Sequence, residues 1–274
     1  MTAVTRLLKK LRRHEADPCL YLYPFSVQSL VVHFAIILAL RGKTRPARDL
    51  SQMGYRLVNI DKNENLREWY LVDVNPLGRV PTLTGKSLPS PLTDALSIVY
   101  WVCDHCPDLL PTAHQTEICR LLCELHETLD GYSAVNPAVE DLLSHHDITP
   151  THRKALEYKR DWQRKQRELV AMNMSVGRSM TGNSVGFLKE IVELRDKHGD
   201  DSPWIFGKAG PTVLDAHVVP FVSWLIDIGL GDLVPDDLDA YAERIRALPQ
   251  GREAMGKRPT VWDASLGPID EIRL

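Results

Sequence analysis

Two serine hydroxyls stand where the chain passes from its first apolar strand into its first long helix. Leu20–Tyr23 has the character of a strand, Ser26 and Ser29 follow, and the apolar run Leu30–Leu40 predicts a buried helix. A hydroxyl at a helix N-terminus can donate a hydrogen bond to sulfur, and the helix dipole favours the thiolate, so both lower the pKa of a thiol held there. Either serine could instead only cap the helix.

The segment Asn75–Leu83, with the sequence NPLGRVPTL, could bind an extended peptide. Pro81 cannot donate to a strand ladder, so it belongs at a sheet edge or a bend. We expect a cis peptide bond between Val80 and Pro81, in a tight turn that leads into an edge strand. That geometry turns the backbone N–H and C=O of Val80 outward, where an extended peptide can pair with them as an added strand. The alternative is an ordinary Val–Pro loop.

The elements that must position these groups alternate between strand and helix. We expect strands at Leu20–Tyr23, Tyr55–Ile60 and Thr82–Leu83, and a hairpin-like turn at Gly85–Lys86 into a further strand at Ser87–Leu88. We expect helices at Ser29–Leu40, Leu66–Val74 (or a loop there) and Thr93–Cys103. This order is that of a thioredoxin-like α/β domain.

Together these features resemble a glutathione S-transferase of the serine type, closest in pattern to the theta and zeta classes and to fungal relatives. The resemblance rests on Ser26 after the first strand, on NPLGRVPTL, and on Leu92–Trp101, which has the pattern of a capped helix start. It implies a thioredoxin-like N-terminal domain followed by an all-α C-terminal domain, with glutathione bound to the first.

The resemblance also implies roles for particular residues. Ser26, or alternatively Ser29, would contact the thiol of glutathione. The backbone of Val80, held by Pro81, would pair with the cysteinyl part, and Arg79 would meet the glycyl carboxylate.

Helix residues Asp94 and Ala95 would bind the γ-glutamyl end, with Asp94 accepting the amine. The family has a serine where this chain has Ala95, so a hydroxyl donor for the γ-glutamyl carboxylate is missing, although helix N–H groups can still bind it. Asn65 and Arg67 are the nearest candidates for the polar side chain that the family often has before "NP".

The rest of the chain has the apolar periodicity of helices, which we expect at Thr116–Leu129, Thr151–Met174, Val185–His198, Thr212–Ile228 and Leu238–Leu248. The domains are then an extension over residues 1–17, a thioredoxin-like domain over 18–106, a linker over 107–114 and a helical domain over 115–274. Thr212 and Asp215 have the spacing of a capping box, so we expect them to be structural rather than catalytic.

Composition and charge restrict the classes of function. The 274 residues carry a net charge of −3, which predicts no nucleic-acid partner. The five cysteines are an odd number and no secretory leader is evident, which favours reduced thiols in the cytoplasm. The longest apolar run is too short to span a bilayer. Residues 5–13 form a basic amphipathic stretch, either a solvated extension or a targeting or membrane-surface segment.

Three other patterns are weaker. Cys103 and Cys106 form a C-x-x-C motif, but redox motifs of this fold follow the first strand, where Ser26 stands. His145–His146 lacks partner spacing for zinc, so no metal site is predicted. The charged run Lys159–Arg167 is expected to be an exposed helix face.

Three functions remain open. The first is conjugation of the glutathione thiolate to an apolar electrophilic small molecule. The second is glutathione-dependent cis–trans isomerisation of a conjugated alkene, as in secondary-metabolite pathways, and the third is a binding protein without catalysis. The resemblance implies a homodimer and a substrate site between the domains, walled by the loop after Ser26, the helix Glu117–Tyr132 and residues near Met172–Met180.

Overall fold

The computed structural model describes residues 17–42, 47–131, 136–175, 180–198 and 202–269, so the basic stretch 5–13 and Tyr132 lie outside the described residues. The smaller part of the structure is built on a three-stranded sheet, in which the strands lie in the order β2-β1-β3. The central strand β1 (Cys19–Leu22) runs parallel to β2 (Gly54–Leu57) and antiparallel to β3 (Thr82–Thr84). These three strands lie where the sequence predicts them, to within a few residues.

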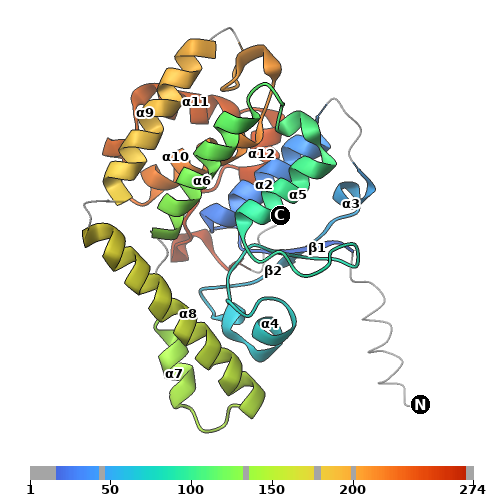
Figure 1. Cartoon of the computed structure of the whole chain (residues 1–274), viewed down its shortest axis with the longest axis vertical. Coiled ribbons are helices and arrows are strands. Elements are labelled where there is room, and N and C mark those ends of the chain that lie inside the picture. Colours follow the sequence, from blue (N-terminus) through green and yellow to red (C-terminus); the bar gives the residue numbers. More distant parts are fainter. Residues whose placement is uncertain (1–16, 43–46, 132–135, 176–179, 199–201, 270–274) are drawn as a thin grey trace.

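Helices cover both faces of this sheet (Figure 1). Side chains of β1 alternate, so Leu20 and Leu22 pack with the residues of α2 (Val27–Leu40) and α5 (Ala95–His105). Tyr21 points to the other face and packs with Tyr70 of α4 (Glu68–Asp73). A short helix α3 (Arg48–Ser51) leads from α2 to β2. This arrangement is the thioredoxin-like layer that the sequence predicts.

The expected strand at Ser87–Leu88 is wrong. Among the described residues, the chain after β3 contributes only an isolated bridge between Leu83 and Leu92. Pro89 and Pro91 lie in this stretch and have no N–H to donate, so a continuous ladder cannot form there.

Helices make up most of the remaining chain: α6 (Gln115–Gly131), α7 (Ala138–Ser144), α8 (Pro150–Ser175), α9 (Met180–His198), α10 (Val213–Asp227), α11 (Asp236–Arg246) and α12 (Pro249–Met255). The short helices α7 and α12 were not predicted from the sequence. Both α10 and α12 pack directly against α2, so one hydrophobic core runs from Leu20 in the sheet to Met255. None of the helices in the described ranges is long and apolar enough to cross a membrane.

The predicted capping box is present at the start of α10. The N–H and the Oγ of Thr212 each donate to Oδ2 of Asp215 at 2.8 Å. Oδ1 of Asp215 accepts from the N–H of Ile205 at 2.9 Å and from the hydroxyl of Tyr241 at 2.8 Å. Asp215 is fully buried, and four donors satisfy its carboxylate, so its role is structural.

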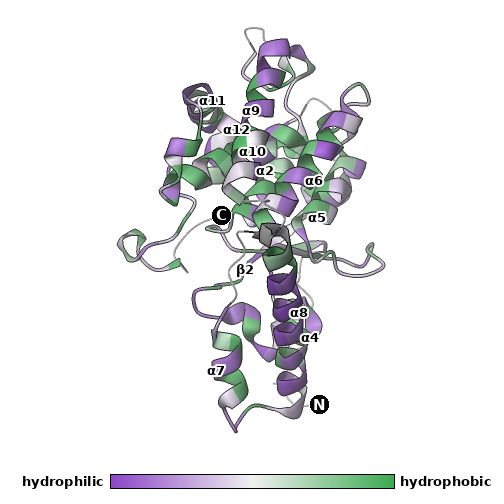
Figure 2. Cartoon of the chain, turned by 60° about the vertical axis from the view of Figure 1, so that its left-hand side comes forward, coloured by the Kyte–Doolittle hydropathy of each residue, from purple (hydrophilic) through white to green (hydrophobic). Residues whose placement is uncertain are grey.

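The hairpin of α7 and α8 (residues 138–175) extends away from the other helices and lies beside α4 (Figure 1). Although α8 is largely hydrophilic (Figure 2), its Leu156 is buried with Leu66, Leu71 and Val139. One face of α8 is therefore covered. The expectation that Lys159–Arg167 is an exposed face is wrong for Lys159 and Gln163, which are only 4% and 5% exposed.

Candidate functional site

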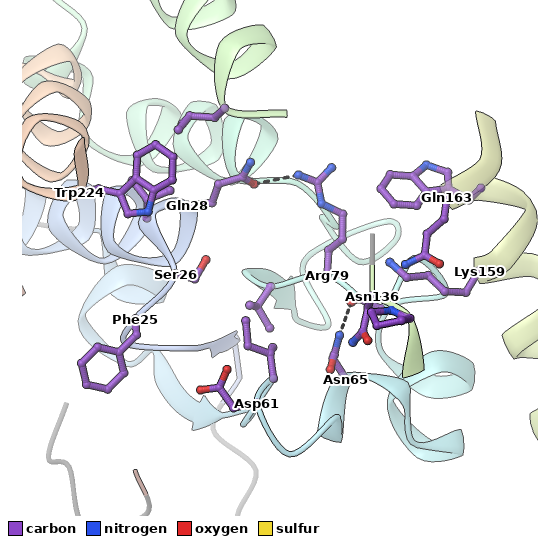
Figure 3. A pocket seen from close by; sticks show the side chains of 17 residues that line it. Phe25, Ser26, Gln28, Asp61, Asn65, Arg79, Asn136, Lys159, Gln163 and Trp224 are labelled. Carbon is purple, nitrogen blue, oxygen red and sulfur yellow. Dashed lines mark hydrogen bonds between the residues drawn. The ribbon is translucent and has the colours of Figure 1, made fainter. Parts of the chain in front are cut away.

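A cavity of about 480 Å³ lies between the thioredoxin-like part and α8 (Figure 3). Its walls come from the β1–α2 connection, the segment before β3, the end of α6, the start of α7, the middle of α8 and Trp224 of α10. Three of the predicted site residues line it, namely Ser26, Arg79 and Val80.

Ser26 is the N-cap residue of α2 and lines one end of this cavity. Its Oγ accepts the backbone N–H of Ser29 at 3.4 Å. Accepting that bond uses a lone pair and leaves the hydroxyl proton free for a ligand. Phe25, Val27, Leu129 and Trp224 form an apolar wall beside it. An anionic atom at this end would meet both a hydroxyl donor and the positive end of α2.

Ser29 lies outside the cavity lining. Its side chain is fully buried, and its Oγ accepts the backbone N–H of Tyr23 at 3.2 Å. The hydroxyl of Tyr23 in turn donates to Asp61, an exposed carboxylate at the cavity. Ser29 therefore braces the turn between β1 and α2, and Ser26 is the serine that faces the cavity.

The peptide bond between Val80 and Pro81 is cis, as the sequence predicts. The carbonyl of Arg79 before it accepts from Tyr70 Oη at 2.7 Å and from Asn75 Nδ2 at 3.0 Å. These bonds fix the turn that leads into β3. The backbone N–H and C=O of Val80 form no hydrogen bond with any other described residue. Val80 thus offers the cavity an unpaired strand edge.

The Arg79 side chain already has partners. Its Nη2 lies 2.6 Å from Oδ1 of Asp130 at the end of α6, and it donates to Oε1 of Gln28 at 3.2 Å. Figure 3 shows this side chain between Gln28 and the residues of α8. Asp130 is half-exposed, so an anion that enters the cavity competes with a weak ion pair for this guanidinium.

Asp94, Ala95 and Pro81 do not line the cavity. Asp94 is the N-cap of α5, and its carboxylate accepts from Ser97 twice, from N–H at 2.8 Å and from Oγ at 2.7 Å. Ala95 is 1% exposed, so its methyl group is packed inside the fold. Position 95 therefore has no hydroxyl to offer a ligand, and the hydroxyl of Ser97 is already bonded to Asp94.

Lys159 of α8 also lines the cavity and was not predicted from the sequence. It lines the end of the cavity opposite Ser26, next to Gln163 (Figure 3). Its Nζ donates to the carbonyl of Leu77 and lies 4.6 Å from the ring centroid of Trp162. No carboxylate in the described part of the chain pairs with it. Burial, and then the positive charge of Arg79, lower the pKa of Lys159 to about 7.

Asn65, one of the two candidates before Pro76, also lines the cavity. Its Nδ2 donates to the carbonyl of Gly78 at 2.8 Å, whereas its buried Oδ1 has no hydrogen-bond partner among the described residues. Arg67, the other candidate, is exposed beside Glu64 and does not line the cavity. The buried Lys159, without a carboxylate partner in the described ranges, favours an anionic group in this cavity, because buried charges are normally paired.

Two of the three predicted substrate walls line this cavity. They are the connection at Ser26 and the end of α6, the latter through Leu129. Met172 lies on α8 outside the cavity lining and is 60% exposed, and residues 176–179 lie outside the described residues. From α8, the cavity is lined by Lys159, Trp162 and Gln163.

The C-x-x-C cysteines lie at the end of α5, away from this cavity. Burial, followed by the neighbouring Cys106, raises the pKa of Cys103 to about 12. Burial also raises the pKa of Cys106. Because the thiolate is the reactive form, these are poor nucleophiles. His145 and His146 are exposed beyond the end of α7.

Comparisons with known proteins show similarity in structure alone. No family model matches the sequence, and no curated protein matches it. A bacterial maleyl pyruvate isomerase, a zeta-class glutathione S-transferase, is 17% identical with a TM-score of 0.52, over 87% of this chain and 96% of the other. A glutathione transferase homologue from Sulfitobacter with bound glutathione is 16% identical with a TM-score of 0.54, over 89% and 99%.

A glutathione transferase family member from Pseudomonas fluorescens, with two glutathione molecules bound, is 16% identical with a TM-score of 0.55. That alignment covers 93% of this chain and 99% of the other. Similarity over nearly the whole length of such chains includes both the thioredoxin-like and the helical parts. This chain therefore has the fold of the glutathione transferases.

Proposed function

We propose that this protein is a glutathione transferase that activates the glutathione thiol for attack on an apolar electrophilic small molecule. The observation that carries the proposal is the composition of one cavity. It combines the Ser26 hydroxyl at a helix N-terminus, the Val80 backbone, and the buried Lys159, and among the described residues Val80 has no backbone hydrogen bond and Lys159 no carboxylate partner. Structural neighbours crystallised with glutathione support the same ligand.

The charges of the cavity fit this tripeptide. Glutathione carries two carboxylates and one ammonium group at neutral pH. The cavity offers one cation, Arg79, one carboxylate, Asp61, and the amine of Lys159, which a bound carboxylate would hold in its protonated form. The Val80 backbone can pair with the central peptide unit. We propose that Lys159 holds a carboxylate of glutathione, the role expected of Arg79 from the sequence.

Each residue then has a physical task. When bound, glutathione supplies a thiol that becomes a nucleophile on losing its proton. Ser26 donates its hydroxyl hydrogen bond to the sulfur, and the N-terminus of α2 stabilises the negative charge. The apolar wall formed by Phe25, Val27, Leu129 and Trp224 accommodates the electrophile beside the sulfur and excludes water.

The test compares wild-type protein with Ser26→Ala and Ser29→Ala. The thiol pKa of bound glutathione is measured by the ultraviolet absorbance of the thiolate across a pH series. We expect the wild type to lower this pKa by at least about one unit, which corresponds to about 1.4 kcal/mol, and Ser26→Ala to abolish the shift. Ser29→Ala should keep the shift and lose only stability. Equal pKa values in wild type and Ser26→Ala would refute the role of Ser26, and absence of glutathione binding would refute the proposed function.

Glutathione-dependent isomerisation is the second candidate, because one structural neighbour is a maleyl pyruvate isomerase. The Ser26 site serves both reactions, so the product decides between them. An activity that uses catalytic rather than stoichiometric glutathione, with no sulfur in the product, favours isomerisation and a role in secondary metabolism. A sulfur-containing product favours conjugation.

We further propose that the protein is a cytoplasmic homodimer. All five cysteines are free thiols, in keeping with a reducing compartment. The dimer rests on the family resemblance. Sedimentation equilibrium of the full chain tests it, and a mass of one chain across micromolar concentrations would contradict it.

A further inference from the structure

Two histidines and a glutamate lie close together where α6 begins and α9 ends, apart from the cavity described above. His114 precedes α6, Glu117 is in its first turn, and His198 is the last residue of α9. One ligand atom from each side chain lies within 4.8 Å of the other two. The cluster lies about 20 Å from the cavity that Ser26 and Arg79 line. Asp130, the ion-pair partner of Arg79, is 13 residues along α6 from Glu117, and each helical residue adds about 1.5 Å.

The cluster is held in place by its surroundings. The ring of His114 stacks on that of Phe206, with 4.2 Å between the ring centroids. The ring of His198 packs against the same phenylalanine, with 5.2 Å between the centroids. Arg120 on α6 forms an ion pair with Glu190 on α9, which ties the two helices together. Nε2 of His198 is buried and has no hydrogen-bond partner among the described residues. A lone pair left unpartnered beside a second imidazole and a carboxylate has the composition of a metal site.

We propose that His114, Glu117 and His198 bind a divalent transition metal ion, with zinc the best match. Two imidazoles select zinc, cobalt or nickel over magnesium or calcium, which prefer oxygen ligands only. Three protein ligands leave the fourth tetrahedral position to water. Because the ligands come from the ends of two helices, the ion cross-links α6 to α9. Its role is to stabilise the helical part, independently of whether glutathione binds.

The experiment titrates the chelator-treated full chain with Zn²⁺ in a calorimeter and with Co²⁺ in a spectrophotometer, in buffer free of glutathione. The variants are His198→Ala and Glu117→Gln, and the matched control is His145→Ala, an exposed histidine outside the cluster. Glu117→Gln preserves shape, so it stays informative if His198→Ala does not fold.

We expect one Zn²⁺ per chain, a rise in Tm with metal, and at least about tenfold weaker binding in both variants with no change in His145→Ala. The Co²⁺ complex should lack the near-ultraviolet charge-transfer band of thiolate ligation. Metal binding that survives in both variants, or that carries the thiolate band, would overturn the assignment. So would the absence of saturable binding up to millimolar Zn²⁺.

Discussion

Replacing Lys159 by methionine should stabilise the unliganded protein and weaken its binding of glutathione. Methionine has a similar length and is apolar, so the substitution removes the charge and keeps most of the packing. Lys159 is 4% exposed and has no carboxylate partner in the described part of the chain, so its charge is held in the fold at a cost. If the variant is both more stable and weaker in glutathione binding, Lys159 is retained for a reason other than stability.

The size of the stability effect follows from the pKa of Lys159, which falls from 10.5 to about 7 on folding. Each unit corresponds to about 1.4 kcal/mol, so the buried ammonium costs about 4 to 5 kcal/mol at pH 7. The hydrogen bond to Leu77 and the contact with Trp162 return about 1 kcal/mol each. The Lys159→Met variant should therefore be more stable than wild type by about 2 to 3 kcal/mol at pH 7.

The sign of the pH dependence is fixed by the same shift. Between pH 7 and pH 10.5 the unfolded chain holds the proton of Lys159 and the folded chain does not. The wild type therefore gains stability as the pH rises through this window, whereas the variant has no such group. The difference in free energy of unfolding should shrink by about 2 kcal/mol from pH 7 to pH 9, as measured by urea denaturation at each pH.

Glutathione should bind more weakly to Lys159→Met, even though this variant is more stable than wild type. A hydrogen bond between a carboxylate and an ammonium contributes about 1.5 to 3 kcal/mol, so the variant should bind glutathione about tenfold to a hundredfold more weakly. Lys165→Met is the matched control, because Lys165 is exposed on the same helix. A stability difference that stays constant with pH, or unchanged affinity in Lys159→Met, would refute the reasoning.

The remaining predictions concern the fold. Asp215→Ala leaves the N–H of Ile205 and of Thr212 and the hydroxyl of Tyr241 without their acceptor, so it should cost several kcal/mol in urea denaturation rather than the roughly 1 kcal/mol of a simple cap. Gly251→Ala places a Cβ 2.2 Å from the carbonyl oxygen of Ile245 and should lower Tm sharply. Gly186→Ala, inside α9 with open space around the new methyl, should raise stability by about 1 kcal/mol, and the opposite order of the two glycine variants would contradict the packing at Gly251.

Much of the fold could be predicted because its signals are local. The strand Cys19–Leu22, the start of α2 beside Ser26, the cis bond at Pro81 and the Thr212 cap each depend on residues within a few positions of one another. Such signals survive in one sequence even where no family model matches. The expected strand at Ser87–Leu88 was wrong because a hairpin also needs donors on its second strand, and two prolines remove them.

The far side of the cavity could not be predicted in this way. On α8, Leu156, Lys159 and Gln163 are spaced as one helix face, and all three are buried. Hydrophobic periodicity overlooks this face because two of its three members are polar. Only the packing of the hairpin against α4, which joins residues far apart in sequence, reveals that the face is covered.

Two buried ionisable groups in this protein differ in how completely their hydrogen-bonding capacity is satisfied. This difference distinguishes a structural residue from one that can bind a ligand. The carboxylate of Asp215 has four donors within 2.9 Å, so nothing remains for a ligand to supply. The ammonium of Lys159 has one carbonyl and a ring face, and no carboxylate among the described residues pairs with it. A fold under selection for stability alone would replace such a group by an apolar one. Its position in the cavity that Ser26 and Val80 also line is explained if a ligand supplies the missing anion, and this argument does not depend on the similarity to known transferases.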